Sequence, residues 1–348
     1  MRIIAISLPR LRVLRHSGLT TRLPDFVALM KPRVMLLAVF TAFVGMMVAP
    51  ASLDPLSGSL ALIAIIVGAG AAGALNMWSD AQIDAVMTRT ARRPIPRGRV
   101  SRREALVFGL SLSSGAVLVL GITTNVVAAS LLAFAIFFYI VVYTLWLKRI
   151  TPQNIVVGGA AGALPPMVGW ASATGGIGLE PIVLFLIIFL WTPPHFWALS
   201  LNRADEYRRA GVPMLPVVAG RSATTRSIFV YSVLLIPTSL LPTALGYAGA
   251  MYGAAALCCG AIFLALALRL HRSPDTDRQA AQRLFLFSIS YLFVLFAALL
   301  VNSLADRSRP TISSRDDVGP NARSAPAVVP QIPLRTAIAF AIARSNEA

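Results

Sequence analysis

The sequence is poor in charged residues and in cysteine. Only 13% of its 348 residues are charged, whereas soluble domains carry roughly a quarter, so a water-soluble fold is excluded. The two cysteines, Cys258 and Cys259, are adjacent in an apolar run, where we expect buried thiols and no normal disulfide. Because zinc-type Cys/His spacing, C-x-x-C-H and a P-loop are all missing, nothing indicates structural zinc, covalently attached haem or ATP use.

Acidic residues are the scarcer charge, with 14 Asp and Glu against 31 Lys and Arg and a formal net charge of +17. Such an excess can indicate nucleic-acid binding. Most of these basic residues, however, lie in short segments between long apolar runs, as expected at the cytoplasmic side of a membrane. We therefore expect the lipid bilayer as surroundings and no nucleic-acid partner.

Long apolar runs are what the sequence has in abundance, since 57% of its residues are hydrophobic. A hydrocarbon core about 30 Å thick requires around 20 mostly apolar residues per helix. We therefore predict an all-α polytopic membrane protein with about nine transmembrane helices. The nine runs are residues 33–50, 57–77, 104–121, 125–147, 154–172, 178–201, 228–248, 250–270 and 283–304.

The connections between these runs alternate in basic content. The segment up to Arg33 and the even-numbered connections carry Lys and Arg, whereas the odd-numbered connections carry none. This bias predicts a cytoplasmic N-terminus. We divide the chain into a basic arm (1–23), a membrane domain (24–304) and a tail (305–348) whose Pro, Ser and Ala content predicts disorder. A bacterial inner membrane is the favoured location; the Arg-rich start leaves a mitochondrial inner membrane as the alternative.

One connection opens with Asn76, Asp80 and Asp84, spaced by four residues. On a helix the three side chains fall on one face. Magnesium is commonly held by one or two carboxylates together with substrate phosphates, so we predict Asp80 and Asp84 as metal ligands and Asn76 as a polar co-ligand. The alternative is that the aspartates cap a helix or pair with Arg89 and Arg93.

At this point the sequence resembles a known family. The string NMWSDAQIDAVMTRTARRPIPRG at residues 76–98 is similar to the first aspartate motif of the UbiA-type intramembrane aromatic prenyltransferases. Further segments resemble one branch, the protoheme IX farnesyltransferases or haem O synthases. They are Lys31-Pro32-Arg33 and residues 143–154, 164–170, 191–199 and 210–216. The resemblance covers about residues 24–304.

The resemblance implies transfer of a farnesyl group from farnesyl diphosphate to haem b, with Mg²⁺ as cofactor. Departure of diphosphate would leave an allylic cation; a haem vinyl group attacks it, and water completes a hydroxyethylfarnesyl side chain. Haem A synthase or oxidase assembly factors are the implied protein partners. The residues that we expect to contact the diphosphate are basic: Lys31, Arg33, Arg89, Arg93 and Lys148.

The second acidic motif of the superfamily is incomplete here. Many members carry a second D-x-x-x-D after the sixth span, whereas the matching loop here offers Asp205, Glu206 and Tyr207 without an aspartate at the fourth following position. These three residues are the candidates for a second acidic site. The number of magnesium ions stays open.

One of only three histidines, His195, falls inside an apolar run. An ionisable residue at membrane depth is a functional candidate, and imidazole ligates haem iron, so His195 is a candidate haem ligand. The alternative is a structural role at a helix break caused by Pro193 and Pro194, where the ring bonds a freed carbonyl.

Two rival functions fit parts of the sequence. A related prenyltransferase would act on an aromatic quinone precursor such as 4-hydroxybenzoate; the segments 193–197 and 212–216 favour the haem branch instead. A non-catalytic transporter would also have many spans, but transporters place their polar site near the bilayer midplane. Here the acidic and basic residues are predicted to cluster at one membrane face.

Overall fold

The computed structural model describes residues 19–308, and side chains within residues 22–305. Throughout this range the chain is helical, with short connections and no β-strand. Most of the predicted arm (1–23) and of the predicted tail (305–348) therefore lies outside the described residues. The division into these three segments stays a prediction.

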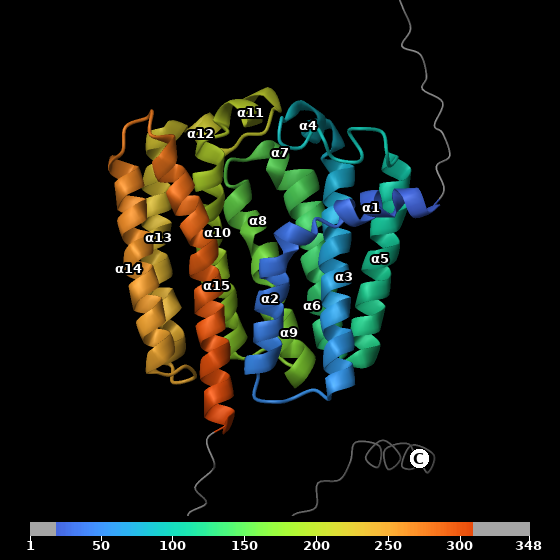
Figure 1. The fold of residues 1–348 in the computed structure, drawn as a ribbon, viewed down its shortest axis with the longest axis vertical. Helices are drawn as coiled ribbons and strands as arrows, with labels where there is room; N and C mark the ends of the chain where they lie inside the picture. Colours follow the sequence, from blue (N-terminus) through green and yellow to red (C-terminus); the bar gives the residue numbers. More distant parts are fainter. Residues whose placement is uncertain (1–18, 309–348) are drawn as a thin grey trace, which may run out of the picture. The chain divides into compact units, whose positions relative to one another are not determined.

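The described chain is an all-α, multi-pass membrane protein (Figure 1). Eight spans are long and apolar enough to cross a membrane individually. A ninth is reached when α1 (Leu19–Leu29) and α2 (Pro32–Val48), which meet at 50°, are taken as one bent pair. The eight are α3 (Pro55–Ser79), α5 (Arg102–Thr123), α6 to α7 (Val126–Ile150), α8 to α9 (Asn154–Thr174), α10 (Leu179–Leu201), α13 (Gly220–Ala244), α14 (Ala250–Arg272) and α15 (Arg278–Ser308).

Helix α3 shows how local sequence signals set the ends of a span. Asp54 caps its N-terminus by accepting hydrogen bonds from the backbone N–H groups of Leu56 (3.1 Å) and Ser57 (3.0 Å). Pro55 occupies the first helical position, where its missing N–H costs nothing. Helix α5 begins similarly with a capping box of Ser101 and Glu104.

Short helices gather at one end of the bundle (Figure 1). They are α4 (Ala81–Val86), α7 (Lys148–Ile150), α11 (Ala204–Arg209) and α12 (Leu215–Val218). We call this end the α4–α11 end. Each of these helices belongs to one of the connections that the sequence marks as basic, so the polar candidates of the sequence are brought to one end.

Buried apolar side chains form two main clusters. One joins α10, α13, α14 and α15 and includes Trp197 and Phe263; the other joins α2, α3, α5, α6 and α9 and includes Leu120 and Leu132. A smaller cluster at the α4–α11 end packs the loop after α4 against α3 through residues such as Ile95. That packing positions the first acidic motif.

The outer surface of the spans is apolar, as a lipid environment requires. Ile122 and Val126, for example, are 75% and 76% exposed. Cys258 in α14 is exposed and Cys259 is partly exposed, so the prediction of two buried thiols is wrong for Cys258. A small apolar side chain costs little when it faces lipid, and an apolar run alone does not distinguish lipid contact from protein contact.

Candidate active site

The residues of the first acidic motif stand at the junction of α3 and α4. Asn76 lies in the last turn of α3, Asp80 follows its end, and Asp84 lies in α4. The helical spacing continues across the junction, because Asp80 N–H donates to the Asn76 carbonyl (2.9 Å) and Asp84 N–H to the Asp80 carbonyl (2.8 Å). All three residues are buried, with 4% or less of their surface exposed.

A polar network surrounds Asp80. Asn76 Nδ2 donates to Asp80 Oδ2 (2.9 Å) and to Thr144 Oγ1 (3.1 Å). Lys148 Nζ donates to the same Asp80 Oδ2 at 2.5 Å, and Lys31 Nζ donates to Asn76 Oδ1. Lys31 and Lys148, two of the residues predicted to contact the diphosphate, therefore lie beside Asn76 and Asp80.

Asp84 is held by a second cation. Arg93 Nη1 lies 2.7 Å from Asp84 Oδ2, and the carboxylate side chain is only 5% exposed. Thr90 Oγ1 fixes the loop by donating to the Asp84 backbone carbonyl at 3.0 Å. The ion pair that the sequence suggested as the alternative to metal binding is therefore present, and it brings Arg93 to the first acidic motif.

The remaining basic candidates lie apart from this network. Arg33 and Arg89 are exposed, and within residues 22–305 no hydrogen bond or ion pair of their side chains occurs. The structure thus brings Lys31, Arg93 and Lys148 together with the carboxylates and leaves Arg33 and Arg89 outside.

Thr144 is a site residue that the sequence analysis missed. It lies in a π-helical segment (η1, Phe138–Leu147), and its hydroxyl donates to the Tyr139 carbonyl at 2.7 Å. Such wide turns are rare and are frequent at functional sites. Thr144 and Lys148 both contact the end of α3 from this segment. In the sequence, the only sign of this role is that Thr144 is a polar residue in an apolar run. A threonine there is explained equally well by an ordinary hydrogen bond to the backbone of its own helix.

Asp80 retains an unsatisfied oxygen. Its Oδ1 is buried and has no hydrogen-bond partner in the described part of the chain, although a buried carboxylate oxygen without a partner costs free energy. A cation at Oδ1 would satisfy it. Since the described residues contain no cluster of three or more His, Cys, Asp or Glu able to hold a metal, such a cation needs further oxygen ligands from substrate or water. Magnesium fits this donor set.

The second acidic loop lies at the same end of the bundle, in α11 (Figure 1). Asp205 is 82% exposed in its side chain and pairs with Arg208 at 2.6 Å, so it is an exposed residue, unlike Asp80 and Asp84. Glu206 lies 3.5 Å from Arg203 and keeps its Oε2 buried without a partner, and Tyr207 is buried. A shallow pocket of about 340 Å³ between α4 and the stretch after α11 shows that the two loops adjoin.

His195 lies in α10, six residues before its last residue. The helix runs unbroken through Pro193 and Pro194, and the ring pairs with a hydroxyl, because Nδ1 lies 2.6 Å from Ser288 Oγ in α15. The imidazole stacks on Trp191 (4.3 Å between ring centroids) and on Phe285 (4.8 Å). The structural alternative supposed a helix break and a hydrogen bond from the ring to a freed carbonyl. In the described part of the chain neither is observed.

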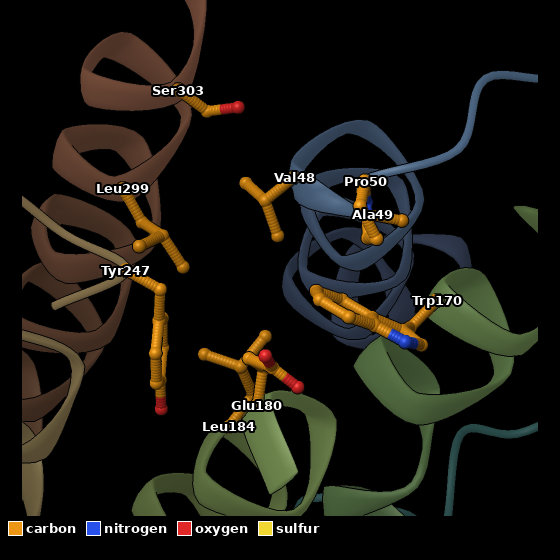
Figure 2. A pocket seen from close by; sticks show the side chains of 9 residues that line it. All are labelled: Val48, Ala49, Pro50, Trp170, Glu180, Leu184, Tyr247, Leu299 and Ser303. Carbon is orange, nitrogen blue, oxygen red and sulfur yellow. The ribbon is translucent and has the colours of Figure 1, made fainter. Parts of the chain in front are cut away.

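A cavity of about 440 Å³ lies at the opposite end of the bundle (Figure 2). Its lining is largely apolar and includes Trp170 and Leu184, and its polar groups include Glu180 and Tyr247. No residue of the two acidic loops lines it. This cavity is therefore distinct from the Asp80 network.

Sequence comparisons place these residues in a family context. The model of the UbiA prenyltransferase family matches residues 38–289. A protoheme IX farnesyltransferase of Parvibaculum lavamentivorans is 60% identical over 282 residues, which cover 80% of this chain and 89% of that protein. One of Rhodopseudomonas palustris is also 60% identical, over 81% of this chain and 91% of that protein.

Solved structures share the fold at low sequence identity. A digeranylgeranylglyceryl phosphate synthase gives a TM-score of 0.69 at 18% identity, covering 82% of this chain and 99% of that one. A UbiA homologue of Archaeoglobus fulgidus bound to GPP and Mg²⁺ gives 0.58 at 13% identity, covering 79% and 99%. Because the family model spans most of the chain and relatives are 60% identical over four fifths of it, the chain belongs to the UbiA prenyltransferase family.

Proposed function

We propose that this prenyltransferase transfers the farnesyl group of farnesyl diphosphate to a vinyl group of haem b, with addition of one water molecule, giving haem O and diphosphate. The observation that carries the proposal is the buried Asp80, with one unpaired oxygen beside the cations of the network. Relatives 60% identical to this chain are named protoheme IX farnesyltransferases, which supports haem b as the acceptor.

The diphosphate is proposed to bind among Lys31, Arg93 and Lys148. Charge-assisted hydrogen bonds to phosphate oxygens are strong and short, and they would replace the bonds that these side chains make to Asn76, Asp84 and Asp80. The substrate would thus release the carboxylates it needs for metal binding. Arg33 and Arg89 stay candidates for the same role, because they flank the site in the sequence.

Asp80 and Asp84 are proposed to hold Mg²⁺, with Asn76 fixing the orientation of Asp80 through its amide. When bound, the ion supplies positive charge that favours departure of the diphosphate. Support comes from the unsatisfied Asp80 Oδ1 and from the family homologue solved with GPP and Mg²⁺. In the second loop, Glu206 and Tyr207 are better candidates for ligand binding than Asp205. The Glu206 Oε2 atom and the Tyr207 side chain are buried, whereas the Asp205 side chain is exposed.

His195 is proposed to bind the iron of the haem acceptor. His195 lies near the C-terminal end of α10, and α11 with the second acidic loop follows that end. A porphyrin at His195 would therefore lie toward the α4–α11 end of the bundle, where the diphosphate is proposed to bind. An aromatic quinone precursor has no metal for this histidine to bind. The charged network also lies at one end of the bundle, which disfavours a transporter with a midplane site.

The α4–α11 end is proposed to face the cytoplasm, with the protein in a bacterial inner membrane. The connections at this end carry the basic residues, and those at the opposite end carry none, which is the distribution expected from the bias of Lys and Arg toward the cytoplasm. Haem A synthase or oxidase assembly factors are the proposed protein partners, because haem O has to be passed on within the membrane.

Incubation of the purified protein in lipid nanodiscs tests the reaction. Farnesyl diphosphate and Mg²⁺ are supplied with either haem b or 4-hydroxybenzoate, and the products are identified by mass spectrometry. We expect farnesylated haem in the first sample and unchanged 4-hydroxybenzoate in the second. Chelation of divalent ions should abolish product formation, and added Mg²⁺ should restore it. A prenylated benzoate with unchanged haem would contradict the assignment of the acceptor.

A further inference from the structure

A buried serine of α15 connects two side chains of α10. Ser288 is fully buried, and its backbone carbonyl accepts a hydrogen bond from Trp191 Nε1 at 2.7 Å. Its hydroxyl oxygen lies 2.6 Å from His195 Nδ1. One residue therefore holds both the indole and the imidazole, which are themselves stacked at an interplanar angle of 18°.

The hydrogen bonds of this serine determine which nitrogen of His195 carries the proton. A hydroxyl has a single hydrogen to donate, and Ser288 Oγ donates it to the Phe285 carbonyl at 2.6 Å. Toward His195 the same oxygen can therefore only accept. The imidazole must donate from Nδ1–H, which in the neutral ring leaves Nε2 with a free lone pair.

Ring packing fixes the direction of that lone pair. The His195 ring stacks on Trp191 at an interplanar angle of 18° and on Phe285 at 29°, and the edge of Phe196 meets it at 89°. Rotation of the ring about its bond to Cβ would break the stacking and the bond to Ser288. Nε2 accepts no hydrogen bond from any described residue and is not among the buried unsatisfied atoms, so it is accessible to a ligand.

We infer that Ser288 and Trp191 are positioning residues that hold His195 as the Nδ1–H tautomer, ready to bind a metalloporphyrin through Nε2. The inference rests on the proposed function and specifies how the acceptor is recognised. Histidines that ligate metals usually donate their other N–H to a fixed acceptor, which sets tautomer and ring orientation. The iron is therefore part of what is recognised, and metal-free protoporphyrin is a weaker ligand than haem b.

Haem binding without farnesyl diphosphate tests this inference separately from catalysis. Haem b is titrated into the protein in nanodiscs while absorption and electron paramagnetic resonance spectra are recorded. The wild type should show an iron bound by imidazole. H195G should lose that signature and regain it when free imidazole is added. The small ligand can occupy the space that the removed side chain leaves beside Trp191 and Phe285. Metal-free protoporphyrin should compete poorly with haem b.

Ser288 needs variants that separate positioning from packing. S288A should weaken haem binding by about tenfold or more, the usual effect of losing such a supporting contact, and should alter the imidazole signature. S288T keeps the hydroxyl and should restore both. The matched control is S232A, which should bind haem normally. Ser232 is equally buried, and within residues 22–305 its hydroxyl bonds only the Ile228 carbonyl of its own helix, at 2.6 Å.

Two results would overturn the inference. One is an unchanged imidazole signature in H195G without added imidazole. The other is S288A binding haem as tightly as the wild type does, with an unchanged imidazole signature. If S288A does not fold, S288C takes its place, because cysteine keeps a side chain of similar size but offers only a weak acceptor to His195 Nδ1–H. Farnesyl transfer by the wild type is measured in a separate experiment. If the haem-ligation test fails, the proposed reaction is not affected. If the wild type has no transfer activity, the proposed reaction is refuted but the haem-ligation result is not.

Discussion

At the scale of single residues, the site combines two buried carboxylates with cations that neutralise them. Lys148 and Arg93 make ion pairs of 2.5 and 2.7 Å with Asp80 and Asp84. Burying a carboxylate without a partner is costly, so these pairs stabilise the two buried carboxylates. In the proposed binding mode the diphosphate takes over these cations, and this exchange of partners would release the proposed metal ligands.

Asp80→Asn removes the charge of the proposed metal ligand while keeping its shape. An asparagine oxygen still accepts a hydrogen bond from Lys148, so folding should persist. We expect kcat/KM for farnesyl transfer to fall on the order of 10²–10³-fold, similar to loss of one key electrostatic contact in other active sites. Steady-state kinetics over a range of Mg²⁺ concentrations measure the change.

The matched control is Asp54→Asn, at the other end of the same helix. Asp54 caps α3, and asparagine caps helices about as well as aspartate, so activity should stay within about twofold of the wild type. Wild-type activity of Asp80→Asn would exclude the carboxylate from the reaction.

Thr144→Val tests the contact that the sequence analysis missed. Valine keeps the shape but leaves one amide hydrogen of Asn76 without its 3.1 Å acceptor. An unpaired buried donor costs about 1–3 kcal/mol, which corresponds to roughly a tenfold loss of kcat/KM if the amide is needed to orient Asp80. Thr144→Ser keeps the hydroxyl and should retain activity. Equal activity of the two variants would show that Asn76 does not depend on this bond.

At the scale of helices, close contact between α2 and α9 depends on glycine. A Cβ added to Gly169 would lie 1.9 Å from the Ala42 carbonyl oxygen, and one added to Gly45 would lie 2.2 Å from the Pro166 carbonyl oxygen. Small residues allow helix backbones to approach in membranes, where lipid competes with apolar side chains and packing has to hold helices together. This contact fixes α2, at whose start Lys31 lies.

Gly169→Ala should therefore destabilise the protein. The methyl group has no space, so α2 and α9 must separate, at a cost of about 1–3 kcal/mol. The control is Gly162→Ala in α8 of the same span, where an added Cβ meets nothing within 4 Å; it should be neutral or slightly stabilising, as helical alanine generally is. Thermal unfolding in detergent, followed by tryptophan fluorescence, compares the two. A Gly169→Ala protein as stable as Gly162→Ala would contradict the packing argument.

The spans could be predicted from the sequence because each apolar run is long and is bounded by polar or turn residues. The residues 76–84 could be placed at a helix end for the same reason. The π-helical segment, the short helices α4, α11 and α12, and the contacts of Ser288 could not be predicted. The hydrogen bond from Trp191 to Ser288 joins residues 97 positions apart, and such pairings depend on tertiary packing that leaves no local pattern.

At the scale of the whole molecule, the two ends of the bundle differ in charge. The α4–α11 end carries the acidic motifs and their arginines and lysines, such as Arg149 and Arg209, whereas the connections at the opposite end carry no Lys or Arg. Farnesyl diphosphate has an anionic head and an apolar tail. A bundle with cations at one end and an apolar body within the bilayer suits both parts of that molecule.

Labelling of single cysteines tests the orientation that this asymmetry predicts. In a background with Cys258→Ala and Cys259→Ala, Asp205→Cys reports on the α4–α11 end and Ile177→Cys on the opposite end; both positions are exposed. If the basic end faces the cytoplasm, a membrane-impermeant maleimide added to bacterial cells with a permeabilised outer membrane should label Ile177→Cys alone. Asp205→Cys should react only after the inner membrane is opened. The reverse pattern would place the Asp80 network outside the cytoplasm, where the farnesyl diphosphate made in the cell could not reach it directly, and would require another route for the substrate.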